Sequence, residues 1–84
     1  MIDVRNNQEV LGYYMTERAF GFGFGVLVKT TYLDGSSRYN FITESLQLAK
    51  EYKTQRGMHK YVTERDWILL DEPILIEECR KRIL

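Results

Sequence analysis

The most regular pattern in the chain is an alternation of aromatic and small residues that begins at residue 20. Phenylalanine and glycine alternate over residues 20–25, and the aliphatic run Val26-Leu27-Val28 follows. Successive side chains of a β-strand point to opposite faces of the sheet. The pattern therefore predicts a long strand over residues 20–33 with an aromatic face, Phe20, Phe22 and Phe24, and a bare face, Gly21, Gly23 and Gly25.

Strands are also predicted on either side of this one, over residues 9–16 and 38–43, because both segments are rich in β-branched and aromatic residues. Asp34-Gly35 predicts the second hairpin turn, since both residue types tolerate positive φ. A loop of two or four residues would place Tyr39 and Phe41 on the phenylalanine face, and a three-residue loop would place them on the glycine face. We expect an even loop, because it groups apolar side chains together.

A helix is predicted over residues 44–56. Thr43 is a candidate N-cap, Leu46, Ala49 and Tyr52 recur at three-residue spacing, and Gly57 is a candidate stop. Residues 59–63 are then expected to form a short strand or an extended connector. Residues 66–70 are ambiguous between strand and helix, because a short apolar run has no diagnostic period.

A second helix is predicted from residue 71 onwards. Asp71 is its candidate cap, Pro73 suits a first turn, and Ile76, Cys79 and Ile83 form its apolar stripe. Together the elements predict one α+β domain over residues 1–84. We expect a three-stranded antiparallel meander, or four strands if residues 60–63 join it, covered on one side by two C-terminal helices. Because the other sheet face would stay partly open, we expect a homodimer.

Alternating glycines weaken a strand, and they usually mark a place where another group approaches closely. Two explanations remain open. A helix, or an aromatic side chain from a neighbouring strand, lies on the glycines; or a partner or ligand docks there.

Composition excludes several classes of protein. The formal net charge is zero, which gives no overall attraction to nucleic acid or to a membrane. No apolar run approaches the roughly 18 residues that a membrane-spanning helix needs. The first residues lack the basic and apolar regions of a signal peptide, and the only cysteine, Cys79, has no partner for an internal disulfide. We therefore expect a cytoplasmic protein.

Candidate catalytic chemistry is sparse. One histidine, His59, and one cysteine, Cys79, are too few for a structural zinc site, and no serine or cysteine nucleophile lies beside the histidine in the sequence. The Gly21-x-Gly23-x-Gly25 series has no following Lys-Ser/Thr and is not a phosphate-binding loop. We expect no cofactor, no metal and no enzymatic activity.

One short motif indicates a second function. The run Arg18-Ala19-Phe20-Gly21-Phe22 resembles the start of the RNA-binding strand motif of RRM and cold-shock domains, in which exposed phenylalanines stack on bases. The resemblance implies single-stranded nucleic-acid binding by Phe20, Phe22 and Phe24, assisted by a basic segment. It departs from the motif at Ala19 and Gly23, so this function ranks second. The basic segment comprises Lys50, Lys53, Arg56, Lys60 and Arg65.

The surplus of aromatic residues favours a non-catalytic protein-interaction module, because aromatic side chains are enriched at protein interfaces. Small size and neutral charge suit a bacterial or phage accessory protein that binds and modulates, for example inhibits, a larger protein. The predicted interaction surface comprises Phe20, Gly21, Phe22, Gly23, Phe24, Gly25, Tyr39 and Phe41.

Overall fold

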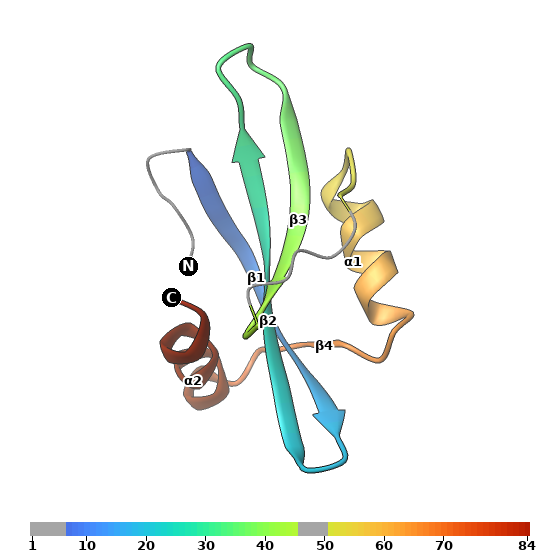
Figure 1. Cartoon of the computed structure of the whole chain (residues 1–84), viewed down its shortest axis with the longest axis vertical. Coiled ribbons are helices and arrows are strands. Elements are labelled where there is room, and N and C mark those ends of the chain that lie inside the picture. Colours follow the sequence, from blue (N-terminus) through green and yellow to red (C-terminus); the bar gives the residue numbers. More distant parts are fainter. Residues whose placement is uncertain (1–6, 46–50) are drawn as a thin grey trace.

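A four-stranded antiparallel sheet with two helices forms the protein, which confirms the predicted α+β class (Figure 1). The computed structural model describes residues 7–45 and 51–84. In chain order the elements are β1 (Gln8–Arg18), β2 (Gly21–Thr31), β3 (Ser37–Thr43), α1 (Gln55–Thr63), β4 (Ile68–Leu69) and α2 (Pro73–Ile83). The strand order across the sheet is β3-β2-β1-β4. Neither helix is long and apolar enough to cross a bilayer, within the part of the chain that the structure describes.

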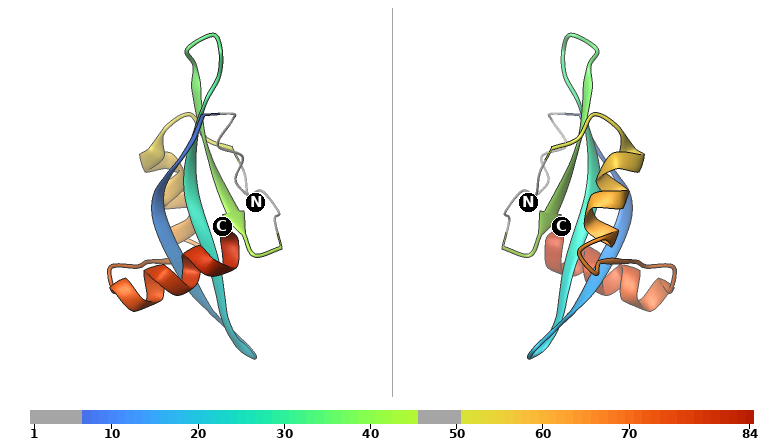
Figure 2. Two further views of the ribbon diagram at one scale, coloured as in Figure 1. Left: turned by 90° about the vertical axis from the view of Figure 1, so that its left-hand side faces the viewer. Right: turned by 90° about the vertical axis from the view of Figure 1, so that its right-hand side faces the viewer.

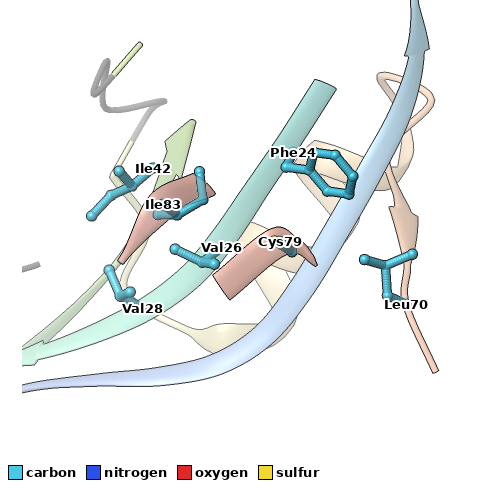
Figure 3. Packing of buried hydrophobic residues seen from close by; sticks show 7 residues of the cluster. All are labelled: Phe24, Val26, Val28, Ile42, Leu70, Cys79 and Ile83. Carbon is cyan, nitrogen blue, oxygen red and sulfur yellow. The ribbon is translucent and has the colours of Figure 1, made fainter. Parts of the chain in front are cut away.

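The two helices pack on opposite faces of the sheet, whereas the sequence predicted that both would cover one face. Each view in Figure 2 shows one helix in front of the sheet and the other behind it. The face that contacts α2, here called the α2 face, carries a buried cluster (Figure 3): Phe24, Val26, Val28, Ile42, Leu70, Cys79 and Ile83. The opposite face, here called the α1 face, carries a second cluster: Tyr14, Leu27, Phe41, Met58 and Val62.

The β2–β3 connection has an odd loop, and this reverses the predicted orientation of β3. Tyr32 and Ser36 are joined by a hydrogen bond of 2.9 Å from the Tyr32 N–H to the Ser36 carbonyl, which leaves three residues between them. Gly35 takes the left-handed conformation (φ 88°). Phe41 consequently pairs with Leu27 on the α1 face. The prediction that Tyr39 and Phe41 share the phenylalanine face is therefore wrong.

The prediction of a helix over residues 44–56 is also wrong for residues 44–45 and 51–54, which the structure describes as non-helical. Glu44 and Ser45 lie in a turn, and Tyr52 pairs with Tyr39 through two backbone hydrogen bonds of 2.8 and 2.9 Å. Predicted stripe residues 46 and 49 lie outside the described residues. Helix α1 begins later because the side chain of Thr54 accepts a hydrogen bond from the Gly57 N–H (3.0 Å) and caps it. Gly57 is thus inside the helix rather than at its end.

Two further boundaries differ from the predictions. Residues 59–63 belong to α1, and the fourth strand is β4, which pairs with β1 at Tyr14 and Met15. At α2, the cap is Glu72 rather than Asp71, because the Glu72 carboxylate accepts from the Leu75 N–H at 3.1 Å. The predicted stripe of α2 is confirmed, since Cys79 and Ile83 are buried and Ile76 packs against the same cluster.

Candidate functional site

The three glycines at positions 21, 23 and 25 differ in what fills the space where a side chain would lie. A Cβ atom at Gly25 would lie 2.6 Å from Cε2 of Phe41, and one at Gly23 would lie 2.7 Å from Cζ of Arg18. At Gly21 nothing lies within 4 Å, and φ is 125°, a conformation that favours glycine. An aromatic ring from the neighbouring strand β3 therefore fills the space at Gly25, which was one of the two explanations left open.

A row of aromatic side chains in edge-to-face contact covers this part of the α1 face. The ring centroids of Tyr14 and Phe41 are 5.4 Å apart, and those of Phe41 and Trp67 are 4.8 Å apart. The Arg18 guanidinium lies 5.9 Å from the Trp67 ring centroid and continues the row outward. Gly23 and Gly25 thus make room for groups from the same chain.

The three predicted phenylalanines do not form one platform. Phe24 is buried on the α2 face (4% exposed), and the Arg82 guanidinium lies 5.2 Å from the centre of its ring. Phe22 is 56% exposed, and Phe20, which lies in the turn rather than in the strand, is fully exposed. We call residues 18–22 the hairpin tip; all five are exposed.

Tyr39 and Phe41, which were also predicted to belong to the interaction surface, lie apart from the exposed phenylalanines. Phe41 is buried and Tyr39 is half-buried, both on the α1 face. Only Phe20, Gly21 and Phe22 come together as an exposed group, at the end of the β1–β2 hairpin. The hairpin tip projects beyond both helices at the bottom of Figure 1.

The predicted basic segment is associated with α1 rather than with the hairpin tip. Arg56 and Lys60 lie on α1, Lys53 precedes it, and all three are exposed. Arg65 follows the helix and stacks its guanidinium 3.7 Å from the Tyr61 ring centroid. Lys50 lies outside the described residues.

The two candidate catalytic side chains have structural partners. The Tyr14 hydroxyl and His59 Nδ1 form a hydrogen bond of 2.8 Å. Cys79 is fully buried, its Sγ donates to the Gly25 carbonyl at 3.5 Å, and burial raises the pKa of its thiol. Within residues 7–45 and 51–84, no three histidine, cysteine or acidic side chains gather as a metal site would require.

A surface hollow of about 510 Å³ lies at the base of the hairpin tip. Residues of β1 meet the segment from the end of α1 to β4 there, and the lining residues are Thr16, Glu17, Thr63, Asp66, Trp67 and Ile68. None of these residues was predicted from the sequence to belong to a site. Trp67, the only tryptophan, was the available signal, but the run around it had no defined period.

No protein-family model matches the chain, and no curated protein or solved structure matches it significantly. A functional assignment therefore depends on the chemistry of the site itself.

Proposed function

We propose that the chain is a non-catalytic protein-interaction module that docks through the hairpin tip. The observation that carries this proposal is the exposure of Phe20 and Phe22, 103% and 56%, at the end of a hairpin that projects beyond the helices. An aromatic side chain left in water gains about 1.5–3 kcal/mol when a partner buries it fully.

The residue types and the rigidity of the tip support docking. Aromatic residues and arginine dominate the energetics of protein interfaces. The Arg18 guanidinium lies against Gly23 and near the Trp67 ring, so the tip contains an arginine as well as the two exposed phenylalanines. Because β1 and β2 pair without interruption from Gly12 and Leu27 to Arg18 and Gly21, docking would order few additional groups, which lowers its entropic cost.

The proposal extends to a cytoplasmic accessory protein, bacterial or from a phage, that binds and modulates a larger protein, for example as an inhibitor. The zero net charge supports this extension, because it gives no overall attraction to nucleic acid or to a membrane. The first partner to test is a second copy of the chain, and the next is a different protein.

The test compares the two ends of the molecule. Leu33, in the opposite hairpin turn, is as exposed as Phe20 and serves as a matched control. A photoreactive amino acid at position 20 or 33 would identify a partner, which is then purified and titrated against the variants. We expect Phe20→Ser/Phe22→Ser to weaken binding by at least about 30-fold, as loss of a hot spot does, and Leu33→Ser to leave it unchanged. Equal effects at both ends would exclude the tip as the docking surface.

Single-stranded nucleic acid is tested separately. Because Phe24 is buried, only Phe20 and Phe22 of the three predicted phenylalanines could stack on bases. We therefore expect no specific binding to single-stranded DNA or RNA. Fluorescence anisotropy with labelled oligonucleotides at about 50 mM salt is the appropriate assay, because low ionic strength exaggerates such contacts. Micromolar affinity that weakens with salt and disappears in Phe22→Ala would replace the protein-docking proposal.

A further inference from the structure

The hollow beside the hairpin tip has walls that are fixed by contacts within the chain. Thr16 Oγ1 donates a hydrogen bond of 2.9 Å to the Asp66 carbonyl and so joins β1 to the loop that follows α1. Asp66 holds the left-handed conformation (φ 68°), which aspartate tolerates better than most residues. The Thr16 side chain and the backbone at Asp66 are therefore held in place by the fold.

The lining hydroxyls and carboxylates of the hollow can only accept hydrogen bonds. A hydroxyl has one proton, and that of Thr16 is committed to the Asp66 carbonyl. The Thr63 proton is committed to the carbonyls of His59 and Lys60, at 2.9 and 3.2 Å. An ionised carboxylate has no proton to donate, and among the described residues neither lining carboxylate forms an ion pair.

The indole of Trp67 adds an aromatic wall, and this wall already attracts a cation. The Arg18 guanidinium lies 5.9 Å from its ring centroid, within the distance at which a cation and an aromatic ring attract each other. The six lining residues include two carboxylates, Glu17 and Asp66, and no basic side chain. An anion would be repelled there, and a neutral amide would leave the charge uncompensated.

We propose that the hollow binds a basic side chain, arginine or lysine, of a protein partner. A guanidinium or ammonium group carries only donors and a positive charge, which matches the acceptor oxygens of the lining threonines and carboxylates and the face of the indole ring. The volume of about 510 Å³ exceeds that of one such side chain, so its aliphatic part can lie along Ile68. This inference goes beyond the proposed function, because the hollow contains no residue of the hairpin tip.

The test uses the complete chain labelled with ¹⁵N. The single tryptophan gives one indole N–H resonance, which reports directly on the hollow. The probe is N-acetyl-arginine methylamide, and the control is the citrulline analogue, which has the same shape without the charge. We expect a saturable shift of the indole resonance with the arginine probe that weakens with salt, and no saturable shift with citrulline. Equal responses to the two compounds would overturn the proposal.

Variants that remove one negative charge from the hollow test whether the arginine probe binds there. We expect Glu17→Gln and Asp66→Asn each to weaken arginine binding by about 2- to 5-fold, the range for an exposed ion pair. Asparagine also tolerates positive φ, so the loop is preserved. Glu9→Gln, an exposed control at the far end of β1, should bind as wild type. Unchanged affinity in both hollow variants would overturn the proposal.

The proposal for the hollow and the proposal for the hairpin tip can be refuted independently of each other. Phe20→Ser/Phe22→Ser should bind the arginine probe with wild-type affinity, because neither phenylalanine lines the hollow. Loss of arginine binding in that variant would place the cation at the tip and contradict the assignment to the hollow. Arginine binding that persists after the tip has been excluded as a docking surface would support the hollow alone.

Discussion

The glycines at positions 21, 23 and 25 differ in the group that lies where a Cβ atom would be. At Gly25 the neighbour is the ring of Phe41, which is 1% exposed and packed against two other rings. At Gly23 it is the end of the exposed Arg18 side chain, which can move aside. A repeat that looks uniform in the sequence therefore serves close packing at one position and a turn conformation at another.

Alanine substitution separates these roles. We predict that Gly25→Ala destabilises the fold by about 1–3 kcal/mol, because the added methyl group overlaps a ring that cannot move. Gly23→Ala should be neutral, or stabilising by up to about 1 kcal/mol, since alanine loses less backbone entropy in a strand. Urea denaturation followed by circular dichroism measures both. Equal destabilisation by the two variants would show that Arg18 is packed as firmly as Phe41.

Tyr14 links the sheet to α1 through its hydroxyl. Its side chain is 2% exposed, and burial raises the pKa of its phenol. A raised pKa in the folded state means that the stabilisation from neutral Tyr14 is complete below the unfolded pKa of about 10 and is lost as the pH rises through the folded pKa.

We predict that Tyr14→Phe is less stable than wild type by about 0.5–1.5 kcal/mol at pH 7, because the hydrogen bond to His59 is lost. The difference should shrink above pH 10, since the variant lacks the ionising group. Thermal unfolding at several pH values tests this, and Tyr32→Phe, at a side chain that is 45% exposed, is the control. A difference that stays constant to pH 11 would contradict the role assigned to Tyr14.

At the scale of elements, local signals located β1, β2, β3 and α2, left β4 undecided, and placed α1 about ten residues too early. Two threonines offered a cap, Thr43 and Thr54, and the apolar spacing before Gly57 favoured the first. The structure uses the second because Tyr52 is held in extended conformation by its pairing with Tyr39. Such a contact between distant residues cannot be obtained from the spacing of apolar positions.

The hairpin register illustrates the same limit. Asp34-Gly35 marked the turn correctly, but the loop length depends on the Asp34 carboxylate, which accepts from the Ser36 N–H at 2.9 Å and from the Ser36 hydroxyl at 2.6 Å. One residue of difference moves Phe41 to the other face. The pairing of apolar side chains favoured the wrong register, because both faces of the sheet carry buried apolar clusters.

The two threonines provide a matched test at this scale. We predict that Thr54→Ala destabilises the protein by about 1 kcal/mol, the usual effect of removing a helix N-cap. Thr43→Ala should cost less than half as much, because among the described residues the Thr43 hydroxyl bonds only to that of Ser45 (2.9 Å), at the surface. Chemical denaturation of both variants supplies the comparison. A larger effect at Thr43 would argue for a helix that starts near residue 44.

At the scale of the whole molecule, one helix on each face changes the argument for self-association. The expectation of a homodimer depended on an open sheet face, whereas each face here packs against a helix. The exposed apolar surface that the sequence did locate is the hairpin tip, through Phe20 and Phe22. The hollow at its base was missed because it joins β1 to residues nearly 50 positions later, and only the folded chain brings them together.

The hairpin tip gives the homodimer a different physical basis, and we retain it as a prediction. Two tips that pack their phenylalanines together would remove apolar surface from water, and a net charge of zero opposes association very little. The contact would be smaller than the roughly 1,200–2,000 Å² of a stable interface, so association should be weak. Light scattering should show a mass that rises from 10.0 kDa towards twice that value through the micromolar range.

The matched variants identify the surface responsible. Phe20→Ser/Phe22→Ser should remain at 10.0 kDa at every concentration, and Leu33→Ser should associate like wild type. A dimer that survives the double substitution would place self-association elsewhere on the chain. A wild-type mass of 10.0 kDa throughout would exclude the second copy as partner and leave the tip to a different protein, because Phe20 and Phe22 would still be exposed to water in the monomer.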